Sequence, residues 1–433
     1  MFIPFPESQV VVKGIEEIRI PELAHMRQIY ESDYIADLKG HLLNQMNAVV
    51  DCPGMLAGKR LAITVGSRGI PNLDLIVRTL CDRLKEWGAL PFIVPAMGSH
   101  GSGTAEGQID YLKGFNITEK TMKVPILSTM DVVHYGTLTD GTHCYCDKYA
   151  YESDGIIVLN KIKPHSEFKG TYESGLAKMI AIGLGNHIGA SEFHAPGFET
   201  FAKRLPEVVE LFLKKCQCLF GIGIVQNAYD EVSELEVIRP ENILERERAL
   251  LEIAKRRIAT FKGKQIDVLV IDEIGKNISG AGHDPNVTGR NSSQLPGFGS
   301  EILDLKRLFV RGLTKESHHN ASGLGMADVT TLRCLRDVDW GATWTNLLNA
   351  TQLRSAMMPL YMNNDFDALM IAIRTLNGVD YNQAKIVRIR NTQCMDDILV
   401  SRSYWESICN RPDVELVSDF VQMQFDEAGN LYG

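Results

Sequence analysis

Residues 61–96, LAITVGSRGIPNLDLIVRTLCDRLKEWGALPFIVPA, decide the fold class. The apolar run at 61–65 has the length of a buried strand and ends at a Gly-Ser-Arg-Gly turn. Residues 72–87 then repeat apolar side chains at helical spacing, with Asn72 as the expected N-cap. A second strand is predicted at 90–96. A strand, helix and strand in this order are typical of a parallel sheet covered by helices.

The alternation continues along the whole chain of 433 residues, which is about two to three times the usual length of one domain. Further strands are predicted at 155–160, 221–225, 266–271, 368–373, 385–390 and 414–418, and further helices from about 104, at 198–217 and at 240–260. We therefore expect an α/β protein of two domains with mainly parallel sheets, and an active site in the cleft between the domains. The N-terminal domain, 1–261, would carry the catalytic and cofactor loops, and a smaller C-terminal domain would comprise 262–433.

Composition and charge narrow the class of protein. Apolar residues make up 45% of the chain and charged residues 23%, as in an average folded globular protein. The net charge is −9 and the longest apolar runs have strand length, so we expect neither nucleic acid nor a membrane as a partner. Residues 1–14 hold prolines and a glutamate where a secretory signal needs basic and apolar regions, which predicts a cytoplasmic protein. The nine cysteines are then expected as reduced thiols, including the close pairs Cys144/Cys146 and Cys216/Cys218.

Three polar residues, Arg68, His100 and His165, follow predicted strands. Because ligands of open α/β sheets lie beyond the carboxyl ends of the strands, we expect these side chains at one edge of the sheet. A guanidinium group binds a carboxylate through two parallel hydrogen bonds, and imidazoles exchange protons near neutral pH. The set therefore suits a small carboxylate substrate, and two bases suit the inversion of a carbon centre. Taken singly, a histidine on a loop is more often an ordinary polar residue.

Two more positions add to this interpretation. Gly98 lets the backbone beside His100 approach a ligand closely, and the helix that starts soon afterwards directs amide groups at any anion bound there. Lys178 interrupts the apolar run LAKMIAIGLG. A lysine in such a run either extends its amine to solvent or has a depressed pKa that suits covalent chemistry.

In order and spacing, these segments resemble the nickel-pincer lactate racemases and their 2-hydroxy-acid racemase and epimerase relatives. The positions that carry the resemblance lie between about 65 and 195 and are Ser67, Arg68 and Pro71; Gly98, Ser99, His100, Thr104 and Glu106; Pro164, His165, Phe168, Gly170, Gly175 and Lys178; and His194. The chain length and the two-domain layout also fit this family.

The resemblance implies a cofactor, the nickel-pincer nucleotide (pyridinium-3,5-bisthiocarboxylic acid mononucleotide). In the family, two sulfurs, a ring carbon and one histidine hold the nickel, and a lysine tethers the nucleotide. By resemblance, Lys178 is the tether, His194 is the nickel ligand, and Ser67 and Gly98 contact the cofactor. Enzymes that synthesise the cofactor are implied as partners.

The resemblance also implies a reaction, the racemisation or epimerisation of a small 2-hydroxy acid. His100 and His165 would alternate as proton acceptor and donor on the substrate hydroxyl, and Arg68 would bind the carboxylate. A hydride would move from the hydroxyl-bearing carbon to the pincer carbon and return to the other face of the keto acid.

The chain departs from the family pattern in three places. Val65 stands where the family has an aspartate, and about three extra residues separate His165 from Lys178. A Gln and Lys pair of the second domain is not recognisable after Asp272, where Lys276 is at best a stand-in. These departures favour a larger hydroxy acid, such as a sugar acid, over lactate.

Two alternative functions stay open. A nicotinamide-dependent 2-hydroxy-acid dehydrogenase would also use a histidine and an arginine, but it needs a dinucleotide fingerprint loop, and the Gly-Leu-Gly at 183–185 is only a fragment of one. A non-catalytic carrier of the pincer cofactor would need Lys178 and His194 but not both His100 and His165. The presence of both histidines favours the enzyme.

Overall fold

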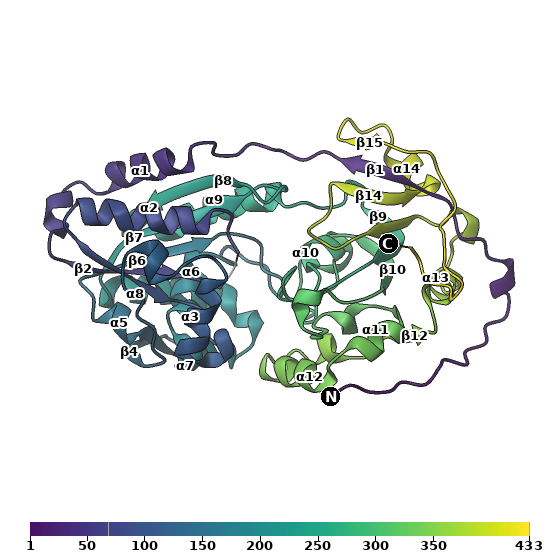
Figure 1. Cartoon of the computed structure of the whole chain (residues 1–433), viewed down its shortest axis with the longest axis horizontal. Helices are drawn as coiled ribbons and strands as arrows, with labels where there is room; N and C mark the ends of the chain where they lie inside the picture. The colour runs from purple at the N-terminus through teal and green to yellow at the C-terminus, as the bar shows by residue number, and fades with distance from the viewer. Residues whose placement is uncertain (68, 433) are drawn as a thin grey trace. The chain divides into compact units, whose positions relative to one another are not determined.

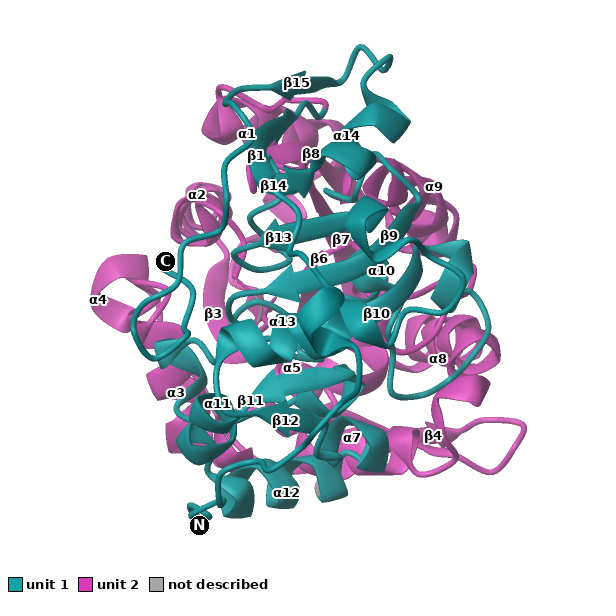
Figure 2. Cartoon of the chain, turned by 90° about the vertical axis from the view of Figure 1, so that its right-hand side faces the viewer, with its two compact units in different colours: residues 1–30, 259–433 teal, residues 31–258 magenta. Residues whose placement is uncertain are grey.

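The computed structural model describes residues 1–67 and 69–432, which form two compact units. Unit 2 is the continuous segment Glu31–Ile258, and unit 1 combines Met1–Tyr30 with Ala259–Gly433 (Figure 2). Each unit has a central sheet with helices packed against it (Figure 1). The α/β class predicted from the sequence is confirmed.

Unit 2 is built on a five-stranded sheet in the order β3-β2-β6-β7-β8. The first four strands are parallel to their neighbours, and β8 is antiparallel to β7. The strands are β2 (Arg60–Val65), β3 (Leu90–Pro95), β6 (Gly155–Lys161), β7 (Cys218–Gln226) and β8 (Val232–Ile238). A separate hairpin pairs β4 (Val132–Thr137) with β5 (His143–Asp147).

The helices of unit 2 connect these strands. They are α1 (Leu38–Val49), α2 (Leu73–Glu86), α3 (Ala105–Lys113), α4 (Glu119–Met122), α5 (Lys148–Tyr151), α6 (Leu176–Lys178), α7 (Asn186–His194), α8 (Phe201–Lys215) and α9 (Ile243–Arg257), with a π-helical turn, η4 (Met179–Gly183), between α6 and α7. Glycines let α6 and α9 lie close to β7, because a Cβ atom at Gly221 would stand 2.8 Å from the side chain of Leu176 on α6. At Gly223 it would stand 2.9 Å from Leu250 on α9. The apolar faces of α1 and α2 pack in one core with residues of β2, β6, β7 and β8.

Unit 1 is built on an eight-stranded sheet in the order β12-β11-β10-β9-β13-β14-β1-β15. Pairing is parallel from β12 to β13 and antiparallel from β13 to β15. The strands are β1 (Leu23–Gln28), β9 (Gln265–Ile271), β10 (Asp304–Val310), β11 (Val329–Thr331), β12 (Leu360–Met362), β13 (Ile386–Ile389), β14 (Asp397–Ser401) and β15 (Val414–Leu416), and the helices are α10 (Pro285–Thr288), α11 (Leu332–Asp337), α12 (Trp340–Asn349), α13 (Asp365–Arg374) and α14 (Arg402–Ile408).

The boundary between the units differs in one respect from the predicted domains 1–261 and 262–433. The long helix α9 ends near the predicted boundary, but Met1–Tyr30 belongs to the same unit as the C-terminal half of the chain. The reason is that β1 is paired between β14 and β15 and so completes the sheet of unit 1.

One local prediction is wrong, and a second is confirmed only for the position of the residue. The run 368–373 was expected as a strand but forms part of α13, whose start is fixed by the Asn364 side chain accepting a hydrogen bond from the backbone N–H of Asp367. Every residue of this run is buried, and a continuous apolar run does not distinguish a buried helix from a buried strand. Asn72 occupies the N-cap of α2, but its side chain makes no capping hydrogen bond because its backbone is left-handed (φ 57°).

Candidate functional site

Among the described site residues, Ser67 follows β2, Gly98 and His100 follow β3, and His165 follows β6, at the carboxyl ends of parallel strands of unit 2. The loops after β2 and β3 rest on the π-helical turn η4. A Cβ atom at Gly66 would lie 2.9 Å from Met179 Cε, and the backbone N–H of Gly98 donates to the carbonyl of Gly183 at 3.1 Å. A π-helical turn is rare and is often found at functional sites. The turn therefore acts as the platform on which two of the predicted loops meet.

Gly98 is needed where it stands because its backbone is left-handed and closely packed. Its φ is +59°, and a Cβ atom there would lie 3.2 Å from Ile182 and 3.3 Å from the Cβ of Ala190. From α3, the Gln108 side chain donates to the Gly98 carbonyl at 3.1 Å. These contacts hold the loop that carries His100 against η4 and α7.

His100 is half-buried and is linked to the loop after β2. Its Nδ1 forms a short hydrogen bond with Oγ of Ser67, which is itself buried. The partner hydroxyl fixes the orientation of the ring. The loops after β2 and β3 are therefore in direct contact. Arg68, predicted as the carboxylate-binding residue, lies outside the described residues.

His165 lies on the loop after β6 with only 6% of its surface exposed. Its Nδ1 accepts the backbone N–H of Glu167 at 3.0 Å, and its Nε2 lies 2.6 Å from Nζ of Lys178. The Phe168 ring packs against the imidazole with centroids 4.4 Å apart. The structure thus joins the predicted tether and one predicted base in a direct contact.

The loop that carries His165 is anchored by Glu173, a fully buried carboxylate that was not predicted. Its two oxygens accept the backbone N–H groups of His165 at 2.7 Å and Gly170 at 3.3 Å. Lys255 of α9 and Lys169 form ion pairs with the same carboxylate, at 3.2 Å and 3.8 Å. A buried carboxylate is tolerated when it is paired and hydrogen-bonded in this way.

The turn that carries Lys178 is anchored by a second buried carboxylate that was not predicted, Glu247 of α9. Its Oε2 accepts the backbone N–H of Ala177 at 2.8 Å, and a Cβ atom at Gly175 would stand only 2.3 Å from its Oε1. Burial raises the pKa of Glu247 to about 7, against the lowering effect of the backbone hydrogen bonds. Its position was visible in the sequence, because it falls on the apolar stripe of α9 with Leu250 and Leu251.

His194, the last residue of α7, has its ring fixed by a hydrogen bond to its own helix. Its Nδ1 donates to the backbone carbonyl of Ala190 at 2.6 Å, so the neutral ring has its lone pair on Nε2. Burial lowers its pKa, and the positive charge of Lys178 lowers it further. The rings of Phe198 and Phe201 pack on its ring with centroids 5.6 Å and 5.1 Å away.

One aromatic side chain connects these groups. Phe198 contacts His165 as well as His194, with centroids 5.8 Å and 5.6 Å away. Ala190, whose carbonyl orients His194, also packs at the position where a Gly98 side chain would stand. The described site residues, Ser67, Gly98, His100, His165, Lys178 and His194, are thus joined by direct contacts or by a shared neighbour.

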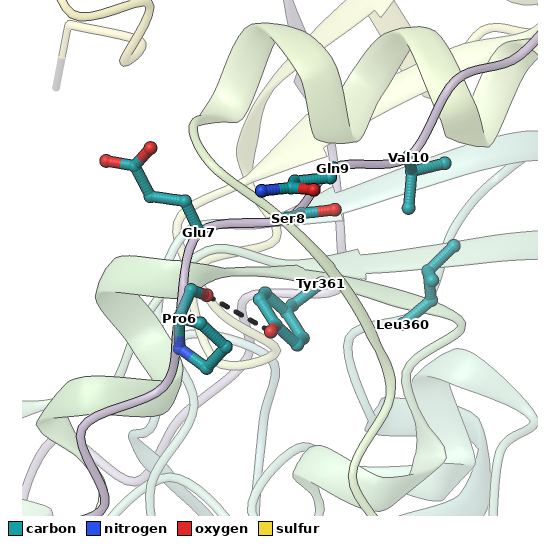
Figure 3. A pocket seen from close by; sticks show the side chains of 7 residues that line it. All are labelled: Pro6, Glu7, Ser8, Gln9, Val10, Leu360 and Tyr361. Carbon is teal, nitrogen blue, oxygen red and sulfur yellow. Dashed lines mark hydrogen bonds between the residues drawn. The ribbon is translucent and has the colours of Figure 1, made fainter.

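Other features of the described chain lie apart from this cluster. A shallow hollow in unit 1 lies between β12 and the N-terminal segment, where the Tyr361 hydroxyl donates to the Pro6 carbonyl at 3.1 Å (Figure 3). No predicted site residue lines it. Within residues 1–67 and 69–432, no three His, Cys, Asp or Glu side chains converge as a metal site. The described helices include none with the length and apolar character needed to span a bilayer.

The close cysteine pairs are structural thiols in unit 2. All nine cysteines are free, as expected. Cys144 and Cys146 both lie on β5 and are buried, and burial raises the pKa of Cys144 to about 12. Only Cys218 of the second pair is in a strand, because Cys216 is the C-cap residue that follows α8.

Comparison with known proteins finds a match for part of unit 2. Residues 55–201 match the family model of the lactate racemase N-terminal domain, and this range contains all seven predicted site positions. Among the solved structures, the lactate racemase apoprotein from Thermoanaerobacterium thermosaccharolyticum aligns with 85% of this chain and 94% of its own, with 13% identity and a TM-score of 0.49. Comparison with the curated proteins finds no match. Residues 55–201 of this chain are therefore similar to the N-terminal domain of the lactate racemases.

Proposed function

We propose that this protein is a racemase or epimerase of a 2-hydroxy acid and that it works with a nickel-pincer nucleotide attached to Lys178. The observation that carries the proposal is the convergence of His100, His165, Lys178 and His194 at one edge of the sheet of unit 2. The match of residues 55–201 to the lactate racemase N-terminal domain supports it.

The chemistry of the residues fits such a cofactor. A histidine that ligates a metal usually donates its other ring N–H to a carbonyl or carboxylate, and His194 does so to Ala190. Its lowered pKa keeps Nε2 unprotonated at neutral pH, as a ligand must be. The charge of Lys178 acts on the His194 ring. Lys178 is half-buried, where a covalent attachment is shielded from water.

A single histidine can hold a nickel ion only if the cofactor supplies the other donor atoms. When bound through Lys178 and His194, the nucleotide would supply the remaining nickel donors and the hydride-transfer chemistry, which no side chain provides. The protein would supply orientation through the buried carboxylates Glu173 and Glu247, which fix the loops of His165 and Lys178.

The remaining residues would handle the substrate. Nε2 of His100 would exchange a proton with the substrate hydroxyl on one face, while Ser67 holds its Nδ1. His165 would act from the other face, and Arg68 would bind the carboxylate through a bidentate contact. Val65, in place of the aspartate of the family pattern, and the shift in loop length before Lys178 favour a substrate larger than lactate.

The test is production of the full chain together with the enzymes that make the cofactor. About one nickel per chain and a mass adduct on Lys178 are expected, with interconversion of the stereoisomers of at least one acid in a panel of short aliphatic, diacid and sugar acids. Lys178→Arg should lose the adduct, whereas the matched variant Lys203→Arg, at an exposed position on α8, should keep it.

Each alternative has its own signature in this experiment. Adduct and nickel without turnover of any acid would indicate a cofactor carrier. Reduction of a nicotinamide nucleotide by a 2-hydroxy acid would indicate a dehydrogenase. Absence of both nickel and adduct would overturn the proposal.

A further inference from the structure

Two exposed histidines of the β4–β5 hairpin face each other nitrogen to nitrogen. Nε2 of His134, on β4, lies 3.3 Å from Nδ1 of His143, on β5. The hydroxyl of Thr137 lies 3.3 Å from the first nitrogen and 3.1 Å from the second. The three atoms therefore form a nearly equilateral triangle on the exposed face of the hairpin.

A β-bulge creates this arrangement. On a regular strand, residues three apart such as His134 and Thr137 face opposite sides. In β4 the register shifts between His134 and Gly136, which inserts one extra residue and returns Thr137 to the face of His134. His143 pairs directly with Thr137 across the hairpin, so it lies on the same face. Bulges often re-aim side chains next to functional sites, and this one gathers three donor atoms.

The strands that carry the triangle are packed on two helices. The buried ring of Tyr135, next to His134, packs against Phe212 of α8 with ring centroids 5.9 Å apart. The backbone N–H of His143 donates to Oε1 of Glu192, on α7, at 3.4 Å. Donor atoms that are already held in place lose little conformational entropy when they bind an ion.

The spacing of the donors fits tetrahedral zinc. Zn–N bonds of about 2.0 to 2.1 Å at the tetrahedral angle place two ligand nitrogens about 3.3 to 3.4 Å apart, and the histidine nitrogens are 3.3 Å apart. A square-planar ion would bring them to about 2.8 to 3.0 Å. The centre of the triangle is about 1.9 Å from each corner, so an ion at zinc distances would stand just above its plane.

The chemistry of the donors favours the same ion. Zn²⁺ binds the lone pair of a neutral imidazole, and two imidazoles can point their lone pairs at one ion. A hydrogen bond from one ring to the other is a poor alternative, because 3.3 Å exceeds the usual 2.7 to 3.2 Å for an N–H donor. The pair is therefore better suited to hold a cation than to bond to itself.

We propose that His134 and His143 bind a Zn²⁺ ion on the exposed face of the hairpin, with the Thr137 hydroxyl and solvent completing the tetrahedron. The site uses none of the residues assigned to the nickel-pincer nucleotide and does not depend on the proposed function. The ion would link β4 to β5 at the bulge, where the ladder is interrupted, and so would stabilise the hairpin.

The experiment titrates ZnCl₂ into the cofactor-free full chain, previously stripped of metal with a chelator, and follows binding by calorimetry. Loss of a partner that only orients a metal ligand typically costs about 10- to 100-fold in affinity, so His134→Gln and His143→Gln should each weaken zinc binding by at least about 10-fold. The matched control is His25→Gln, at an exposed histidine on strand β1, and it should leave the affinity unchanged.

Two further controls identify the ion and the site. His194→Ala removes the proposed nickel ligand and should retain the zinc. Mg²⁺ in excess should not compete, because it prefers oxygen ligands. Unchanged affinity in either hairpin variant, or loss of zinc in His194→Ala alone, would overturn the inference. These outcomes do not test the nickel-pincer proposal, whose adduct on Lys178 is measured separately.

Hydrogen–deuterium exchange provides a second readout. Zinc should slow exchange in peptides covering 131–147 of the wild type, because the ion ties the two strands together, and should have no such effect in His143→Gln. Equal exchange in the wild type with and without zinc would show that no ion links the strands and would overturn the inference.

Discussion

Replacing Gly98 by Ala tests whether the His100 loop is clamped on η4 and α7. An alanine with φ near +59° pays a backbone strain of roughly 1 kcal/mol. Its Cβ would also stand 3.2 Å from Ile182 and 3.3 Å from Ala190, and crowding of this kind in a packed region commonly costs about 1 to 3 kcal/mol. We expect Gly98→Ala to lower the free energy of unfolding by about 2 to 4 kcal/mol, or to displace the loop.

Gly58 provides the matched control. Its φ is +75°, but a Cβ atom there meets nothing within 4 Å, so Gly58→Ala should cost only the backbone strain of roughly 1 kcal/mol. Urea denaturation gives the stability difference, and hydrogen–deuterium exchange of peptides covering 96–104 and 179–190 locates it. Equal stability of the two variants, with unchanged exchange in both peptides, would refute the clamp.

Three further predictions concern the titratable side chains His194, Glu247 and Arg68. His194→Ala should lose nickel from the cofactor-loaded protein while His187→Ala, at an exposed position on the same helix, retains it, as metal analysis would show. Because the folded pKa of Glu247 is raised from 4.5 to about 7, the folded chain keeps a proton that the unfolded chain loses between these values, and stability falls as pH rises through this window. Glu247→Gln should remove up to roughly 3 kcal/mol of that fall in denaturation experiments between pH 4.5 and 7, and an unchanged slope would contradict the burial argument. Arg68→Lys should lower kcat/KM by roughly 10- to 150-fold on the best acid with nickel retained, and wild-type kinetics would reject carboxylate binding by Arg68.

Most of the sheet of unit 2 follows from the sequence because β2, β3, β6 and β7 contain short apolar runs. The strand at 61–65, the helix after Asn72 and the strand at 90–96 all form where periodicity predicts them. The pairing of β1 with β14 and β15 could not be predicted, because it joins segments more than 350 residues apart and no local pattern records it. The same holds for α13, where burial on all sides removes the periodicity that distinguishes a helix from a strand.

Part of the candidate site could also be predicted from the sequence. Side chains at strand ends can be placed by the rule that parallel strands share an edge, and this rule brings the loops of His100 and His165 to one end of the sheet. Glu173 accepts backbone N–H groups within the His165 loop itself, and Glu247 of α9 accepts the backbone N–H of Ala177 in the Lys178 turn. The contact of Glu247 depends on how α9 packs on the sheet, and the residue type alone does not reveal either contact.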